Sequence, residues 1–279
     1  MLNKYRRNER VAAVLATLSS SPNKVYSLSF FGKQFQVAKS TVSEDIDMLR
    51  EIVAQHGIGS VETVTGAAGG VRYQPFMCGN AAYTYIQTLC AELSGPQRVL
   101  PGGFLYLSDI LSHPDIVKHM GAILAGLFQW KTPDFILTME TKGIPVALMT
   151  AAALGIPLVT ARRTSKAYEG AAVNINYVSA STGSIETMSL SRRAVKEGQR
   201  VLIVDDFLKG GGTAKGMIDL MGEFSAEVVG LAFVMETVSP AKKYISDAKS
   251  LMTLRMTDDE VPIAVVEPAS WLHTYGLEG

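Results

Sequence analysis

Two adjacent carboxylates and a glycine-rich turn occur together in the segment VLIVDDFLKGGGT, which runs from Val201 to Thr213. The glycines at 210–212 allow consecutive backbone N–H groups to point toward one anion, and Thr213 adds a hydroxyl. A helix over Ala214 to Phe224 would direct its positive N-terminus at the same anion. The segment therefore predicts a phosphate-binding loop. A tight connection between a strand and a helix is the alternative.

The two acids at the mouth of this loop need a different partner. Asp205 and Asp206 would repel a phosphate, so their carboxylates must accept hydrogen bonds from hydroxyl groups or bind a metal ion. A ribose that carries a 5′-phosphate supplies both the hydroxyls and the anion. The spacing does not match a P-loop, which ends in Gly-Lys-Ser/Thr, or a GxGxxG dinucleotide loop. The acids and the loop together predict a phosphoribosyl site.

Alternating strand-like and helix-like segments beyond residue 80 predict the scaffold that positions these groups. FILT (Phe135 to Thr138) and VLIV (Val201 to Val204) are short and apolar enough to be central strands. Strands that alternate with helices form a mostly parallel α/β sheet, and ligands bind beyond the carboxyl ends of its strands. We therefore expect the loops that follow both strands to lie at one edge of the sheet.

Composition limits the class of protein. At 279 residues, with 47% hydrophobic and 19% charged residues, the chain is long enough for two globular domains and too apolar to be disordered. Cys78 and Cys90 lack the spacing of a zinc site, which fits a reducing cytoplasm. The longest weakly polar run, residues 146–159, is shorter than the roughly 20 residues that a membrane span needs. We expect a cytoplasmic protein without a membrane partner.

The start of the chain places basic residues before an apolar run, as a signal peptide does. Glu9 interrupts the basic region, however, and Val11, Val14, Leu15 and Leu18 fall on one face of a helix. These features favour an amphipathic helix over an export signal.

Two further helices follow at the spacing of a helix-turn-helix. Ser29 to Phe35 predicts a short helix, and a turn through Val37 and Ala38 leads to a longer one that Ser40 or Thr41 can cap. The expected buried stripe of this helix comprises Val42, Ile46, Leu49 and Val53. The segment GIGSVETVTGAAGGVRYQP then alternates apolar and polar residues around a glycine-rich tip, which indicates a hairpin. Three helices and a hairpin predict a winged helix.

Charge is distributed unevenly along a chain whose net charge is zero. Residues 1–74 contain nine basic and six acidic residues, a net charge of +3, and the remainder carries −3. A basic winged helix predicts a DNA partner, with the start of the recognition helix against base edges and phosphates and the wing against the backbone or minor groove. The candidate DNA-contacting residues are Arg6, Arg7, Arg10, Lys39, Ser40, Thr41, Ser43, Gly69 and Arg72.

Two points count against DNA binding. Glu44, Asp45 and Asp47 lie on the same recognition helix and must point partly away from phosphate. Some winged helices serve dimerisation only, and that role is the alternative for this domain.

The motifs resemble those of a known family. VLIVDDFLKGGGT is similar to the phosphoribosyl pyrophosphate (PRPP) motif of type I phosphoribosyltransferases, TMETKGIP (residues 138–145) to their pyrophosphate loop, and ARRTSKAYEG (residues 161–170) to their mobile loop. The three segments lie between residues 138 and 213, and the resemblance that they carry extends over most of residues 80–260. With the winged helix and the segments GAAGGVRY, LPGGF and VNINYVS, the whole chain resembles the purine operon regulators, or repressors, of Gram-positive bacteria.

This resemblance implies a role for each matched residue. Asp205 and Asp206 would hold the ribose 2′- and 3′-hydroxyls, residues 209–213 the 5′-phosphate, and residues 141–143 the pyrophosphate, in a loop that typically contains a strained peptide bond. Basic residues of the mobile loop would close over the ligand, although each could equally be an exposed turn residue. Mg²⁺ would bridge pyrophosphate and ribose oxygens. The implied PRPP-binding set is Asp205, Asp206, Phe207, Lys209, Gly210, Gly211, Gly212, Thr213, Thr141, Lys142, Gly143, Arg162, Arg163 and Lys166.

Departures from the family bear on catalysis. Enzymes of the family usually have a small residue in place of Lys209 and commonly a threonine in place of Gly210. A lysine attracts phosphate but crowds the loop, which favours retention of a ligand over turnover. The four histidines, at positions 56, 113, 119 and 273, lie outside the three loops, so no general acid or base can be assigned. We expect ligand binding without turnover, with no catalytic residues; a purine phosphoribosyltransferase with an accessory N-terminal domain is the alternative.

The combined expectation is a winged-helix DNA-binding domain at residues 1–74 and a phosphoribosyltransferase-like effector domain at residues 75–279. The chain would be a homodimeric regulator, on the resemblance a repressor, of purine biosynthesis genes. Its DNA operator binding would be controlled by PRPP, with Mg²⁺ but without a metal site made of protein side chains. Other nucleotides that bear a pyrophosphate would compete for the same pocket.

Overall fold

The computed structural model describes the chain except for residues 1–4, 67–68, 165–169, 180–182, 258–261 and 276–279. The chain divides into two compact units. The smaller unit comprises Met1–Met77 together with Ala152–Gly155, and the larger unit comprises Cys78–Ala151 together with Ile156–Gly279.

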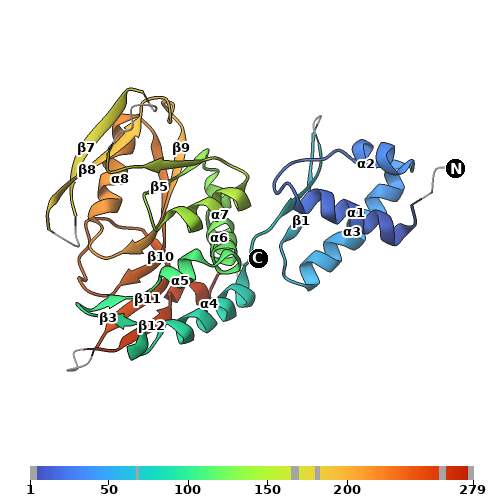
Figure 1. The fold of residues 1–279 in the computed structure, drawn as a ribbon. Helices are drawn as coiled ribbons and strands as arrows, with labels where there is room; N and C mark the ends of the chain where they lie inside the picture. Colours follow the sequence, from blue (N-terminus) through green and yellow to red (C-terminus); the bar gives the residue numbers. More distant parts are fainter. Residues whose placement is uncertain (1–4, 67–68, 165–169, 180–182, 258–261, 276–279) are drawn as a thin grey trace. The chain divides into compact units, whose positions relative to one another are not determined.

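Within its described residues, the smaller unit contains three helices and an antiparallel hairpin (Figure 1). These elements are α1 (Arg7–Ser19), α2 (Leu28–Phe35), α3 (Lys39–Gln55), β1 (Ser60–Val64) and β2 (Gly70–Gln74). The predicted stripe of α3 is buried in one core with the apolar face of α1 and with Phe31 and Phe35 of α2. The predicted order of helices and hairpin is therefore confirmed.

The start of α3 differs from the prediction. Ser27 caps α2, because its hydroxyl accepts a hydrogen bond from the Phe30 N–H at 3.2 Å. Gln36 then turns the chain with a left-handed φ of +56°. The prediction that Ser40 or Thr41 caps α3 is wrong, because α3 begins at Lys39 and its cap residue, Ala38, has no side-chain hydrogen bond to offer. Both hydroxyls instead lie on the first turn of the helix.

The described part of the larger unit is built on a six-stranded sheet in the order β12-β11-β10-β9-β5-β6. All neighbours are parallel except β11 and β12. The strands are β5 (Phe135–Met139), β6 (Leu158–Ala161), β9 (Arg200–Leu208), β10 (Glu227–Thr237), β11 (Lys249–Met256) and β12 (Ala264–Pro268). The mostly parallel α/β sheet predicted from the sequence is confirmed.

Helices and two small hairpins surround this sheet (Figure 1). In the described residues, the α-helices are α4 (Gly79–Leu93), α5 (Ser108–Ser112), α6 (Pro114–Phe128), α7 (Ile144–Leu154) and α8 (Gly212–Glu223), and the 3₁₀ turns are η1 (Pro96–Arg98), η2 (Gln129–Lys131) and η4 (Ser270–His273). The hairpins pair β3 (Val99–Leu100) with β4 (Phe104–Leu105) and β7 (Ala172–Val178) with β8 (Ile185–Ser191). None of the helices in the described residues has both the length and the apolar character needed to cross a membrane.

The two predicted central strands, β5 and β9, are neighbours in the sheet. Alternate side chains of a strand point to opposite faces. Val201 and Ile203 therefore join the core that β9 shares with α8, whereas Leu202 lies with Phe128 of α6 over Gly230. Both faces of the sheet are buried, which explains why these strands are continuous apolar runs.

Candidate functional site

The predicted acid pair lies where the two central strands separate. β5 pairs with β9 only as far as Leu137 opposite Ile203, whereas β9 continues beside β10 to Leu208 opposite Glu236. Residues 205–208 are therefore the end of a strand and not the mouth of a loop, which corrects the sequence-based expectation. Beyond residue 203 the edge of β9 that faced β5 is released from strand pairing and is available to a ligand.

Asp205 and Asp206 lie in a desolvated environment. Asp205 is 6% exposed, and its Oδ1 accepts hydrogen bonds from the Asp206 N–H at 3.0 Å and the Thr138 hydroxyl at 3.4 Å. Burial, reinforced by the charge of Asp206, raises the pKa of Asp205 well above its ordinary value. Burial also raises the pKa of Asp206, and the charge of Lys142 acts in the opposite direction. Buried like charges are typical of a binding site, where a ligand supplies the missing hydrogen bonds.

The predicted pyrophosphate loop reaches this pair through Gly143. The peptide bond between Glu140 and Thr141 is cis. A Cβ atom added at Gly143 would overlap the Asp205 carboxylate and would lie 2.6 Å from the Thr138 hydroxyl. Only glycine permits this close approach of the loop to the strand end.

The glycine loop joins β9 to α8. Gly211 has a left-handed φ of +84° and is the cap residue of α8, which begins at Gly212, two residues before the predicted Ala214. The Gly210 carbonyl accepts a hydrogen bond from the Tyr244 N–H at 2.9 Å, which fixes the loop from outside. The first turn of α8, including Thr213, borders a cavity, so this helix N-terminus can face an anion there.

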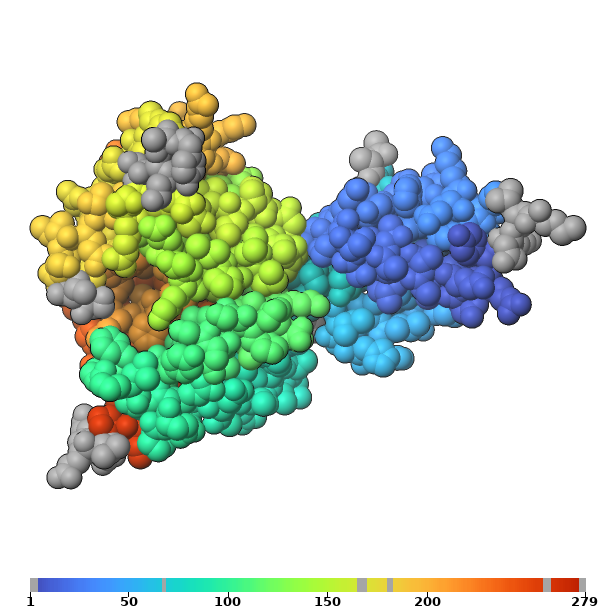
Figure 2. Space-filling view, in the orientation of Figure 1, coloured from blue at the N-terminus to red at the C-terminus, as the bar shows by residue number. Residues whose placement is uncertain are grey.

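The cavity has a volume of about 960 Å³. Figure 2 shows a hollow in the larger unit in which orange atoms, from the region of β9 to β10, lie deep between the green and yellow segments. Asp205 and the segment from Phe207 to Thr213, which runs from the end of β9 into α8, line one part of the cavity. The other walls come from β4 and from the carboxyl ends of β10 and β11, with Phe104, Val238 and Met256 as apolar residues.

Sequence reasoning did not identify these further walls. The strands that supply them are separated from the acid pair by long stretches of chain, and their residues have no distinctive spacing. The one available signal was the glycine pair in LPGGF, because Gly102 and Gly103 both have a left-handed φ and turn the chain into β4.

The arginines of the predicted mobile loop are held by acids. Glu140 accepts a hydrogen bond from the Arg163 N–H at 2.7 Å and one from the Arg162 guanidinium at 3.4 Å. The Arg163 guanidinium pairs with Glu186 of β8 at 2.9 Å. Neither arginine is among the described residues that line the cavity. Lys166, the third predicted cation, lies outside the described residues.

Most of the candidate DNA-contacting residues lie on the surface of the smaller unit. Arg6, Arg7, Lys39, Ser40 and Ser43 are exposed, and Thr41 is half-buried. A groove of about 420 Å³ runs between α3 and the hairpin, and its lining includes Lys39, Ser43 and Gly69. The structure thus places the start of the recognition helix and the wing on the two sides of one groove.

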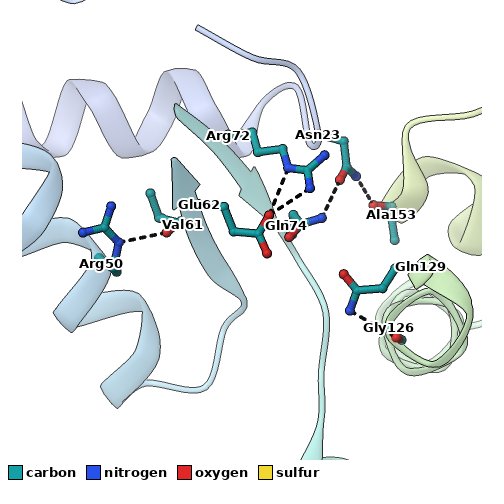
Figure 3. Close-up of polar contacts among 9 residues, drawn as sticks. All are labelled: Asn23, Arg50, Val61, Glu62, Arg72, Gln74, Gly126, Gln129 and Ala153. Carbon is teal, nitrogen blue, oxygen red and sulfur yellow. Dashed lines mark hydrogen bonds and ion pairs between the residues drawn. The ribbon is translucent and has the colours of Figure 1, made fainter. Parts of the chain in front are cut away.

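The hairpin is attached to α3 by a residue that the sequence reasoning missed. Arg50 donates hydrogen bonds to the Val61 carbonyl at 3.0 Å (Figure 3) and to the Thr63 hydroxyl at 3.1 Å. The predicted DNA contact Arg72 is paired across the hairpin with Glu62 at 2.8 Å (Figure 3). Its charge is therefore partly neutralised.

Arg10 has a structural role instead of the predicted DNA contact. It is 9% exposed, and its guanidinium donates to both carboxylate oxygens of Asp45, at 2.6 and 3.1 Å. Asp45 is only 1% exposed, so the pair crosses the interface between α1 and α3. The hydrogen bond to Asp45 raises the pKa of Arg10. We leave Arg10 out of the DNA-contacting set. Of the three acids expected to point partly away from phosphate, only Asp45 faces the core; Glu44 and Asp47 are exposed, and Asp47 lines the groove.

The four histidines lie outside the described lining of the cavity. His119 and His273 lie against the rings of Tyr85 and Tyr83, and His56 and His113 occupy helix ends. The described residues contain no cluster of three or more His, Cys, Asp or Glu side chains placed to hold a metal ion.

Comparison with known proteins agrees with both kinds of domain. Residues 6–75 match the family model of the bacterial purine repressor N-terminal domain, and residues 107–270 match that of the phosphoribosyl transferase domain. An adenine phosphoribosyltransferase from Rhodothermus marinus has a similar structure, with a TM-score of 0.51 and 26% identity, and the match covers 60% of this chain and 96% of the enzyme.

Similarity to named regulators extends over nearly the whole chain. The purine biosynthesis transcriptional repressor PurR of Bacillus subtilis is 42% identical over 251 residues, which are 90% of this chain and 88% of the relative. The purine biosynthesis transcriptional activator PurR of Lactococcus lactis is 39% identical over 253 residues, covering 91% of this chain and 93% of the relative. The resemblance drawn from the sequence motifs is confirmed, and this chain belongs to the PurR family of purine biosynthesis transcriptional regulators.

Proposed function

We propose that this protein regulates transcription of purine biosynthesis genes by binding operator DNA through residues 1–74 and PRPP through residues 75–279. The observation that carries the proposal is the presence in one chain of a purine-repressor N-terminal domain and a phosphoribosyl transferase domain whose cavity is lined by the buried Asp205 and the glycine loop. A cytoplasmic homodimer would present two recognition helices to two half-sites of double-stranded DNA. The second domain would bind its ligand without turnover.

The cavity suits PRPP chemically. Asp205 and Asp206 would accept hydrogen bonds from the ribose hydroxyls, the loop before α8 would hold the 5′-phosphate, and Lys142 would attract the pyrophosphate. The hard oxygens of the acid pair fit Mg²⁺, and because further side-chain ligands are lacking among the described residues, ligand oxygens would supply most of the coordination. Another nucleotide with a pyrophosphate group would compete for the same anion sites.

PRPP can control DNA binding only if it binds the DNA-competent and DNA-incompetent states with different affinities. The relatives include a repressor and an activator. We propose repression for this protein, and in vitro transcription from a purine promoter with and without the protein tests that sign.

Fluorescence anisotropy on DNA from upstream of a purine biosynthesis gene tests the proposal as a whole. We expect tight, salt-sensitive binding that shifts when PRPP and Mg²⁺ are added. DNA affinity that is unchanged at saturating PRPP would refute the control by ligand. If no DNA binding occurs under either condition, turnover of purine bases with PRPP becomes the leading function.

Exposed cations of the smaller unit should contribute to DNA affinity through phosphate contacts. We expect Arg6→Ala and Lys39→Ala each to weaken binding on all DNA sequences alike and to lower the slope of log affinity against log salt by about 1. Lys196→Ala, an exposed lysine of the larger unit, serves as the control. Unchanged affinity in both test variants would favour the dimerisation role of the winged helix.

Gly143→Ala should disturb the acid pair directly. The added methyl group would collide with the Asp205 carboxylate, so we expect a loss of unfolding free energy of about 1–3 kcal/mol, as for overpacked cores, together with weaker PRPP binding. Gly222→Ala is the matched control, because a Cβ at this helical position meets nothing within 4 Å. Calorimetric titration and thermal unfolding of both variants check the prediction, which fails if Gly143→Ala behaves like Gly222→Ala.

A further inference from the structure

A chain of polar contacts connects the segments around the proposed PRPP site. Glu186 of β8 is at its centre: its Oε2 lies 2.9 Å from the Arg163 guanidinium and also accepts a hydrogen bond of 2.9 Å from the Tyr177 hydroxyl. The Glu186 side chain is 17% exposed, whereas that of Arg163 is 62% exposed. The carboxylate is therefore held in place while the arginine is the partner with freedom to move.

Tyr177 connects the Glu186 carboxylate to α8, the helix whose N-terminus faces the proposed 5′-phosphate site. It is 7% exposed, and a Cβ atom added at Gly216, in the first turns of α8, would lie 3.0 Å from its Cβ and Cγ. Burial, followed by the interaction with Glu186, raises the pKa of Tyr177 to about 12, so the hydroxyl stays protonated and donates at neutral pH. Thr213, in the first turn of α8, interacts with the same hydroxyl.

The backbone of Arg163 is attached to the proposed pyrophosphate loop. Its backbone N–H donates to Glu140, the residue directly before Thr141. The Arg163 main chain thus lies beside the proposed pyrophosphate loop. Its guanidinium, in contrast, is directed to Glu186 on the hairpin of β7 and β8. A guanidinium binds phosphate oxygens by the same paired hydrogen bonds that it makes with a carboxylate.

We propose that Glu186 is a positioning residue that competes with the pyrophosphate of the ligand for Arg163 and thereby sets the affinity of the site. This inference rests on the proposed PRPP function. When the anionic ligand binds, Arg163 exchanges the Glu186 carboxylate for phosphate oxygens, and Glu186 keeps its hydrogen bond from Tyr177. Glu186 therefore weakens ligand binding, although it lies outside the cavity lining.

Calorimetric titration of the full chain with PRPP and Mg²⁺ tests the exchange. Glu186→Gln keeps the acceptor for Tyr177 and removes the charge, so we expect PRPP to bind about two- to fivefold more tightly, the range of a partly exposed ion pair. Arg163→Ala should weaken binding, and Glu186→Gln should have no further effect in the Arg163→Ala background. Glu227→Gln is the matched control, because Glu227 pairs with Arg200 at the opposite end of β9 and β10.

The outcomes separate this inference from the function on which it rests. Absence of PRPP binding by the unaltered protein overturns both. Binding by the unaltered protein with equal or lower affinity in Glu186→Gln, or an effect of Glu186→Gln that persists without Arg163, overturns the exchange alone. If Glu186→Gln does not fold, Glu186→Ala removes the same charge, and an unchanged or lower PRPP affinity then overturns the exchange.

Discussion

Asp205→Asn will bind PRPP about 10- to 100-fold more weakly than the unaltered protein and will unfold at a higher temperature. The loss corresponds to the roughly 1.5–3 kcal/mol of hydrogen bonds that a charged acceptor makes. The gain in stability follows from the raised pKa of Asp205, which means that the folded protein disfavours the charged carboxylate. We expect the free energy of unfolding to rise by about 1 kcal/mol and the melting temperature by roughly 2–4 °C. Stability commonly rises when a functional residue is replaced by one that suits the folded protein better.

The pH dependence of this gain distinguishes a charge effect from a packing effect. Because the folded-state pKa is raised, the contribution of Asp205 to stability is fully present below its unfolded pKa of about 3.9 and is lost as the pH rises through the raised value. The difference in melting temperature between Asp205→Asn and the unaltered protein should therefore be largest at neutral pH and should shrink in acid.

Asp219→Asn provides the control for this experiment, because Asp219 is an exposed residue of α8 paired with Lys215. Calorimetric titration with PRPP and thermal unfolding between pH 5 and 8 measure both effects. A variant that binds PRPP normally would show that the pocket has been misplaced, and a lower melting temperature at neutral pH would contradict the proposed cost of the buried charge.

Arg10→Ala will destabilise the smaller unit by about 3 kcal/mol, because it leaves the buried Asp45 carboxylate without its partner. Hydrogen exchange of amides in α1 and α3 measures this loss within the full chain. Arg7 also approaches Asp45, at 3.5 Å, but its side chain is 53% exposed and compensates little.

The double variant Arg10→Met with Asp45→Leu separates the structural role from a DNA contact. Apolar side chains of similar size can replace a buried ion pair without loss of stability, so we expect protection from exchange to return. DNA affinity should return with it. A double variant that is stable but binds DNA weakly, with a reduced salt slope, would restore Arg10 to the DNA-contacting set.

Local patterns were sufficient to predict the elements that carry the chemistry. The acids, the glycine loop and the start of α8 are contiguous in the chain, so their residue types alone indicate a strand, a phosphate loop and a helix. The period of 3.6 residues predicted the stripe Val42, Ile46, Leu49 and Val53, which is buried. In both cases the interactions that matter connect near neighbours in the sequence.

Interactions between distant residues could not be predicted in this way. Asp45 and Arg10 are 35 positions apart in the chain. The sequence alone predicts an exposed charge for each, because the packing of α1 on α3 that buries them is not visible in it. Asp205 and Asp206 looked like loop residues because nothing in the sequence shows that β9 keeps its pairing with β10 after it leaves β5. Strand register and ion pairing depend on partners from other elements, which a local pattern does not specify.

The sequence by itself determined the family and the two kinds of domain, and it predicted the residues with which a phosphoribosyl ligand would interact, because these depend on residue types at short spacing. Only the tertiary structure decided the state of those residues. It buried Asp205 against Gly143, removed Arg10 from the surface, added walls from β4, β10 and β11 to the cavity, and directed Arg163 to Glu186. Burial, electrostatic environment and competition between partners are properties of the packed chain, since each is set by groups that only folding brings together.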